Sequence, residues 1–358
     1  MNIPATELKQ TLRKLSPVRT ETYQVSDGLS AQDSDIYVFA GGPLADPTNP
    51  YSINGKKLTQ VTNRMSGQIE ITRQDRVLTL KSARAKVELE IQPIKPLKVP
   101  ESPKSLTPFD LGLFKAALVK ATAWASTNKS AQFGGVIQVR TIPPVALDDT
   151  TSPGYAVVGT DGNSLSVVEV GYPLLDEYSW LINLEAAAVV QLMDSAPFGI
   201  GATDNHLKIQ SGSTVVYASR PNKNFPDYPK FVPTQFDFTI QVKSADFVSA
   251  LRTVEPLIDE PTDGGGISIQ IKDGVVQLNS LGTGERAEDF VEYDQVYPDP
   301  VFDPKEFQLK MKAQYLSSFF SKAGESSTVS FLGPLKPIKL QSGDITTIVM
   351  PIGPKEKK

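Results

Sequence analysis

The side chains that could carry out catalysis are few and widely separated in this sequence. The one histidine, His206, lies in DNHLKIQSG, between a turn and a short alternating segment. A catalytic histidine needs an orienting carboxylate and a nucleophile close by, and the neighbouring residues suggest neither. The carboxylate pairs at 148–149 and 259–260 lie in proline-containing loops, which is typical of solvated turns. These residues indicate no catalytic centre.

Sequence motifs for binding phosphate, metal or an acyl group are missing as well. The glycines at 264–266 are not followed by the helix and Lys-Ser/Thr of a phosphate-binding loop. No HExxH or GxSxG pattern occurs, and without cysteine there is no disulfide, thiolate nucleophile or cysteine-ligated zinc site. We therefore expect a protein that is not an enzyme and has no cofactor or metal. An enzyme of an unrelated class is the least favoured alternative.

The bulk composition is that of a globular protein. The chain has 358 residues, enough for two or three domains, and no apolar run long enough to span a membrane. The N-terminal segment MNIPATELKQTLRKL lacks the apolar core of a secretory signal, so we expect a cytoplasmic location. The net charge of −4 argues against non-specific wrapping by nucleic acid. Cations gathered on one face could still contact it.

One pattern of alternating apolar and polar residues occurs three times along the chain. The segments are RVLTLKSARAKVELEI (76–91), HLKIQSGSTVVYASR (206–220) and PIKLQSGDITTIVMPI (337–352). The alternation predicts half-buried strands, and the Ser-Gly or Ser-Ala in the middle predicts the turn of a hairpin.

Helical periodicity precedes each hairpin and also opens each repeat. The six segments with apolar residues at helical spacing are 6–15, 55–65, 114–123, 183–195, 246–254 and 310–323. Each repeat therefore runs helix, strands, helix, strands. The proline- and lysine-rich segment 95–108 and the NFPDYPK turn separate the repeats, so we expect domains at 1–103, 104–234 and 235–358.

Three short motifs within this repeat give a family resemblance. TDGNSL at 160–165, NFPDYPK at 224–230 and VMPI at 349–352 make the chain resemble the bacterial beta sliding clamps, the processivity subunits of DNA polymerase III. The resemblance implies an α+β fold of three tandem clamp domains, each with two helices packed on antiparallel sheets. It also implies a head-to-tail homodimeric ring that encircles double-stranded DNA, is loaded by an ATP-dependent clamp loader and tethers the replicative DNA polymerase. The alternative is a clamp-fold interaction protein that binds replication partners without encircling DNA.

In the family, short peptides of the polymerase and the clamp loader dock in an apolar pocket between domains 2 and 3. Carried over by motif, the pocket residues are Phe133, Thr160, Gly162, Leu165, Pro226, Lys230, Phe231, Leu335, Pro337, Ile348, Met350, Pro351 and Ile352. Rigid prolines and apolar side chains suit a pre-formed peptide site. Pro226 and Phe231 could instead only pack the domain junction.

The resemblance also places the helices around the DNA. The cations expected to face DNA are Lys9, Arg13, Lys14, Lys56, Lys57, Arg64, Lys115, Lys120, Arg252 and Lys312. A few such cations would give weak, sequence-independent attraction; the alternative is that they are simply solvated. The apolar candidates for the dimer contact are Leu89, Ile91, Leu257 and Ile258.

The chain departs from the family at two places. Asn163-Ser164 stand where the family usually has His-Arg, so a cation is missing there, although Lys230 could replace it. GPKEKK continues past the usual C-terminal end, either in solvent or over the pocket. Together with the short first domain, these departures suit a divergent clamp, such as one that a bacteriophage encodes.

Overall fold

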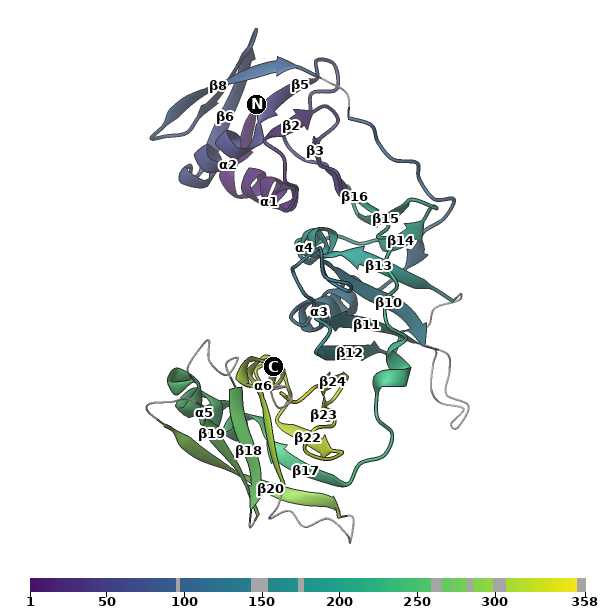
Figure 1. Cartoon of the computed structure of the whole chain (residues 1–358). Helices are drawn as coiled ribbons and strands as arrows, with labels where there is room; N and C mark the ends of the chain where they lie inside the picture. The colour runs from purple at the N-terminus through teal and green to yellow at the C-terminus, as the bar shows by residue number, and fades with distance from the viewer. Residues whose placement is uncertain are drawn as a thin grey trace. The chain divides into compact units, whose positions relative to one another are not determined.

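The computed structural model describes residues 1–94, 97–142, 154–172, 177–258, 266–272, 274–281, 286–298 and 307–352 (Figure 1). The C-terminal GPKEKK segment and both carboxylate pairs lie outside these residues. Contacts group the chain into two compact units. The N-terminal unit is Met1–Leu118 with Trp180–Asn222, and the C-terminal unit is Val119–Ser179 with Lys223–Lys358.

Antiparallel strands form one continuous sheet in the N-terminal unit. In the order of pairing they are β1 (Asn2–Pro4), β6 (Gln68–Gln74), β7 (Val77–Lys81), β8 (Lys86–Pro93), β5 (Tyr51–Asn54), β2 (Thr22–Val25), β3 (Leu29–Gln32), β4 (Ile36–Ala40), β16 (Thr214–Ser219), β15 (His206–Ser211), β14 (Phe198–Ala202) and β9 (Thr107–Pro108). The first and second repeats meet at β4 and β16, where Tyr37 lies opposite Tyr217.

Helices α1 (Ala5–Leu15) and α2 (Gly55–Arg64) belong to the same unit, as does α4 (Leu184–Gln191), which follows β13 (Ser179–Asn183). Helix α1 buries Leu8, Leu12 and Leu15, as the helical spacing predicts. An asparagine caps both α2 and α4: the Asn54 side chain accepts from the Lys57 N–H, and Asn183 accepts from the Ala186 N–H. These caps satisfy backbone donors that have no partner within the helix.

A second antiparallel sheet runs through the C-terminal unit. The strands of this sheet that lie wholly within the unit are, in the order of pairing, β10 (Val136–Ile142), β11 (Gly154–Thr160), β12 (Ser164–Val170), β24 (Ile345–Val349), β23 (Ile338–Ser342), β22 (Ser326–Phe331), β17 (Phe238–Lys243), β20 (Glu288–Pro298), β19 (Val275–Ser280), β18 (Gly266–Lys272) and β21 (Gln308–Lys312). The 3₁₀ segments are η1 (Tyr228–Phe231) and η2 (Glu255–Leu257).

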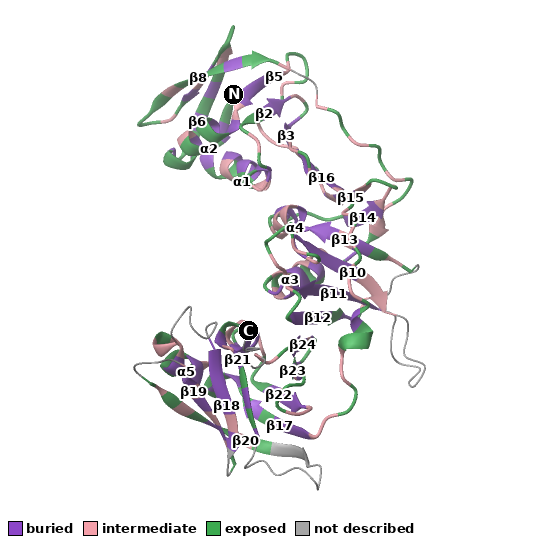
Figure 2. Ribbon diagram, viewed as in Figure 1, coloured by how far each residue is buried: buried purple, intermediate pink, exposed green. Residues whose placement is uncertain are grey.

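Two helices pack together over the sheet of the third repeat. Side chains of α5 (Ser244–Val254) and α6 (Ala313–Phe320) share one buried core with strands β17 to β22. The rings of Phe247 and Phe320 stack with centroids 4.1 Å apart. Along β19, buried residues alternate with half-buried ones, and along β21, Leu309 and Met311 are buried while Gln308 and Lys310 are exposed (Figure 2).

The expected α+β class, with two helices in each repeat and antiparallel sheets, is confirmed. Helix α3 (Leu111–Thr122) completes the six predicted helices, and the three predicted hairpins are β7–β8, β15–β16 and β23–β24. Two of the predicted helices were too long. Residues 310–312 belong to strand β21, where Met311 is buried and Lys310 exposed, and α6 ends at Phe320. Helix α4 ends at Gln191, four residues before the predicted end. The two sheets divide the second repeat between the two units, and the three domain boundaries stay a prediction.

Among the described residues, no helix has both the length and the apolar character needed to cross a bilayer.

Candidate functional site

Two of the three motifs lie side by side in the C-terminal unit. Strand β12 pairs with β24, so that Leu165 lies opposite Ile348 and Ser164 opposite Val349. Beyond the strand end, the Met350 N–H donates to the Asn163 carbonyl at 3.0 Å. The TDGNSL turn and the VMPI segment, far apart in the sequence, therefore lie next to each other at one end of the sheet.

The third motif, NFPDYPK, contacts this end of the sheet through a small hydrophobic cluster. Tyr228 of η1 packs with Leu165 and Ile348 and is itself buried. The cluster also contains Ala156, Val158 and Val167 from the same sheet. Burial raises the pKa of the Tyr228 hydroxyl above its ordinary value. We call this region, formed by residues 160–165, 225–231 and 348–352, the motif junction.

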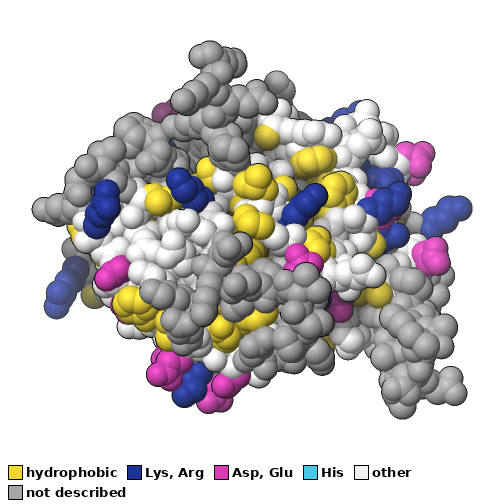
Figure 3. Space-filling model, turned by 60° about the horizontal axis from the view of Figure 1, so that its bottom comes forward, with side chains coloured by type: hydrophobic (Ala, Val, Ile, Leu, Met, Phe, Trp, Pro, Cys, Tyr) yellow, Lys and Arg dark blue, Asp and Glu magenta, His cyan; other side chains and the backbone are white. Residues whose placement is uncertain are grey.

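Large apolar side chains reach solvent in and beside the motif junction. Phe231 is 57% exposed, Met350 45% and Leu335 60%. The pairing of Ile338 with Val349 places the Leu335–Pro337 segment at the same end of the sheet as Met350. Figure 3 shows hydrophobic side chains at the surface among lysine and arginine side chains on one face. Exposed apolar groups gathered on a rigid frame are typical of a docking surface.

The TDGNSL turn is held by an extensive set of hydrogen bonds. Asp161 Oδ1 accepts from the N–H groups of Asn163 and Ser164 at 2.9 and 2.8 Å. The Gly162 N–H donates to Thr160 Oγ1 at 3.1 Å, and Gly162 has φ +94°. Glycine tolerates this left-handed backbone without a steric penalty. The turn therefore has one well-defined shape.

Helix α6 fixes the other oxygen of the same aspartate. The Tyr315 hydroxyl donates to Asp161 Oδ2 at 2.7 Å, and its ring stacks on Trp124 with centroids 6.0 Å apart. Burial, followed by the bond to Asp161, raises the pKa of Tyr315. Lys312, one of the predicted DNA-facing cations, lies with Nζ 5.8 Å from the Tyr315 ring centroid.

Charged contacts shape the FPDYPK turn. Asp227 accepts from Arg140 at 2.9 Å and pairs with Lys230 at 3.2 Å. The hydrogen bond from Arg140 holds the pKa of Asp227 below its usual value. Lys230 remains 77% exposed, so its ammonium is accessible beside the motif junction. Pro226, Pro337, Pro351 and Ile352 are half-buried in the adjoining segments.

The last predicted pocket residue, Phe133, also reaches the motif junction. Its ring meets that of Phe225 edge to face, with centroids 6.3 Å apart. All of the predicted pocket residues thus lie in the C-terminal unit, on segments that contact or adjoin the motif junction.

The predicted DNA-facing cations divide into two groups. Lys9 donates to the Met65 carbonyl and Lys115 to the Met193 carbonyl, both at 2.7 Å. Lys14 pairs with Asp194 at 3.2 Å, and Lys120 with Asp344 at 2.7 Å. The exposed group comprises Arg13, Lys56, Lys57, Arg64 and Arg252. Lys312 belongs to neither group, because it is half-buried beside the Tyr315 ring.

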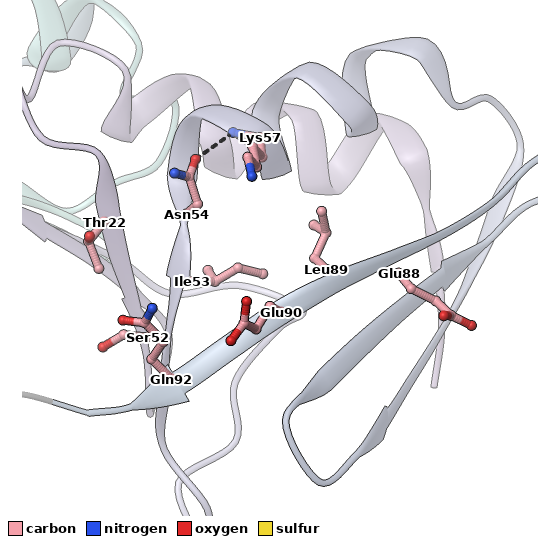
Figure 4. Close-up of a pocket in the computed structure, with 9 residues that line it drawn as sticks. All are labelled: Thr22, Ser52, Ile53, Asn54, Lys57, Glu88, Leu89, Glu90 and Gln92. Carbon is pink, nitrogen blue, oxygen red and sulfur yellow. Dashed lines mark hydrogen bonds between the residues drawn. The ribbon is translucent and has the colours of Figure 1, made fainter.

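A cavity of about 250 Å³ lies beside the predicted dimer-contact residue Leu89 (Figure 4). It opens where β8 leaves β7 after Glu90 and pairs with β5 from Ile91 onward. Glu88, Leu89 and Glu90 line it, and the side chains of both Leu89 and Ile91 are buried. In the C-terminal unit, Leu257 and Ile258 are half-buried after α5, and Ile258 packs against the core.

The described part of the chain contains acidic side chains and one histidine, which are residue types that bind metal ions in proteins. Its acidic and histidine side chains form no group of three that could hold a metal ion. His206 is half-buried in β15, and its backbone N–H donates to Thr203 Oγ1.

Sequence reasoning missed several residues that shape the motif junction. Tyr315, Arg140 and Lys223 act through contacts with residues distant in the sequence. The TDG motif gave a local signal for Asp161 alone, because an aspartate that precedes glycine in a turn commonly accepts nearby N–H groups.

Solved structures of bacterial sliding clamps match the whole chain. The DNA polymerase III beta subunit of Thermotoga maritima has a TM-score of 0.84 and 16% identity, over 99% of each chain. The beta sliding clamp of Caulobacter crescentus has a TM-score of 0.82 and 16% identity, over 99% of this chain and 98% of that one. The Pseudomonas aeruginosa sliding clamp with ligand has a TM-score of 0.80 and 17% identity, over 99% of each chain. The expected sliding-clamp fold is confirmed.

Similarity in sequence is lower and more local. The beta sliding clamps of two Streptococcus pneumoniae strains are 25% identical over 144 residues, or 39% of this chain. In this match the chain spans 36% of the length of these curated relatives. No protein-family model matches the chain.

Proposed function

We propose that this chain, which has the sliding-clamp fold, is a DNA sliding clamp that tethers a replicative polymerase to duplex DNA. The observation that carries the proposal is the match of 99% of the chain to a DNA polymerase III beta subunit with a TM-score of 0.84. Its role is that of a scaffold and not of an enzyme. In a bacterial cell or a phage-infected one, such a clamp works in the cytoplasm.

The motif junction is the proposed docking site for partner peptides of the polymerase and the ATP-dependent clamp loader. Phe231, Leu335 and Met350 offer exposed apolar surface, while paired strands and hydrogen-bonded turns hold the segments around them. An extended peptide could bury its apolar side chains there without ordering the site first. Lys230 supplies a cation for an acidic peptide group.

Contact with DNA is proposed to come from the exposed cations of the helices. Arg13, Lys56 and Arg64 lie on α1 and α2, and Arg252 lies on α5. The lysines that bind carbonyls or carboxylates within the chain would contribute less. A small number of accessible cations suits sliding, because it gives weak attraction without sequence preference.

Ring closure is proposed to join two copies head to tail. The cavity beside Leu89 is lined by Glu88 and Glu90 together with Lys57, and Leu257 and Ile258 follow α5. An apolar contact between these two segments would join the copies.

Light scattering over a dilution series tests the ring. The chain is 38.9 kDa, so a closed two-subunit ring gives about twice that mass. A monomer at every concentration, both without DNA and with circular DNA, would contradict the ring. That result would favour the second candidate, a clamp-fold protein that binds replication partners at the motif junction without encircling DNA.

A further inference from the structure

Lys223 binds three backbone carbonyls of a single loop. Its Nζ lies 2.9 Å from the Lys129 oxygen, 3.1 Å from the Ala131 oxygen and 2.6 Å from the Gly134 oxygen. An ammonium group has three donors and no acceptor, so these contacts use its whole hydrogen-bonding capacity. Bonds from a charged donor are stronger than those between neutral groups.

The loop is folded so tightly that its carbonyls converge. The Gly135 N–H donates to the Ser126 carbonyl at 2.6 Å, and Gly135 has φ +76°. A Cβ at Gly134 would fall 1.8 Å from the Asn128 oxygen, so only glycine fits there. Carbonyl dipoles that point to one place need a positive group between them. Lys223 provides that group.

Along the chain, Phe133 lies between Ala131 and Gly134, whose carbonyls Lys223 binds. It sits within the loop that Lys223 holds, and its half-buried ring meets Phe225, two residues after Lys223. One short segment therefore contacts the loop twice, through a charged group and through an aromatic ring. Phe225 is the first residue of the FPDYPK turn of the motif junction.

We propose that Lys223 is a positioning residue for the peptide site, because it holds Phe133 in place before a peptide binds. The inference rests on the proposed docking function. The ligand is an extended peptide with apolar side chains, one of which packs against Phe133. Without the ammonium, the three carbonyls would turn toward water, and the peptide would have to order the loop as it binds.

The test compares Lys223→Met, which keeps the length and apolar character of the stem, with Lys223→Arg, which keeps the charge and several donors. Lys243→Met is the matched control, since Lys243 is an exposed lysine of the same unit. Hydrogen exchange reports on the amides of residues 126–135. Fluorescence anisotropy reports binding of a labelled synthetic peptide. The peptide carries two leucines and a phenylalanine, which serine and glycine residues separate.

The expected result for Lys223→Met is faster exchange confined to this loop and peptide binding weaker by about tenfold. Lys223→Arg should keep much of the slow exchange and of the peptide affinity of the wild-type protein. Lys243→Met should change neither the exchange rate nor the affinity. Faster exchange with unchanged affinity would overturn the proposal, and so would unchanged exchange. If the wild-type protein binds no peptide, docking fails and the proposal with it; exchange would then still show whether Lys223 orders the loop.

Discussion

Tyr315 donates a 2.7 Å hydrogen bond to Asp161 and thereby ties α6 to the turn between β11 and β12. Asp161 uses its other oxygen to bind the backbone of that same turn. One carboxylate thus fixes the turn and connects it to a helix of the third repeat.

Replacing Tyr315 with phenylalanine is expected to lower the free energy of unfolding by about 1 kcal/mol, because Asp161 Oδ2 loses its donor. Chemical denaturation measures the change. A double-mutant cycle with Asp161→Asn isolates the pair, since the two side chains are in direct contact. Strictly additive losses would show that the bond contributes no coupling between turn and helix.

Gly162→Ala should strain the TDGNSL turn, because Gly162 has φ +94°. We expect a loss of about 1–3 kcal/mol in the free energy of unfolding, together with weaker binding of the leucine–phenylalanine peptide. The control is Gly171→Ala. A Cβ at either position would meet no described atom within 4 Å, but only Gly162 has the left-handed backbone. Equal effects of the two substitutions would rule out backbone strain as the cause.

Met350→Ala combined with Pro351→Ala is expected to abolish peptide binding and leave the fold and the oligomer intact. Met350 is 45% exposed and Pro351 half-buried, so their loss removes contact surface with little core packing. Anisotropy with the same peptide measures the effect, and Val77→Ala, another exposed apolar residue, is the control. Unchanged affinity would remove these two residues from the docking site.

Charge reversal at Arg13 should weaken DNA binding and processive synthesis. Arg13 is exposed on α1, whereas Lys9 on the same helix is bound to the Met65 carbonyl. Losing one phosphate contact should lower the slope of log affinity against log salt by about 0.9. Arg84→Glu, in the β7–β8 turn, is the matched control. If both variants bind DNA alike across a salt series, α1 does not face DNA.

Sequence patterns predicted the regular elements well. Leu8, Leu12 and Leu15 fall on one buried face of α1, and the Ser-Gly turns lie at the predicted hairpins. Local periodicity sufficed there, since burial repeats with the period of each element. The motifs also indicated the segments that meet at the motif junction, but through resemblance to a family and not through physical derivation.

The partners of long charged side chains could not be predicted. Lys115 and Lys223 bind backbone carbonyls. Because every residue has a backbone carbonyl, the sequence does not indicate which one a lysine binds. Lys120 pairs with Asp344, which is far away along the chain. A lysine on an amphipathic helix can bind DNA, water or its own chain, and only tertiary structure decides between these.

Retention on DNA tests the central claim most directly. The protein is loaded onto a closed circular duplex with its clamp loader and ATP, then separated from free protein at high salt, before and after the circle is cut once. A sliding clamp stays on the closed circle and leaves when the DNA is linearised, because topology and not contact holds it. Equal retention on both forms, or none on the circle, would contradict a clamp that encircles DNA.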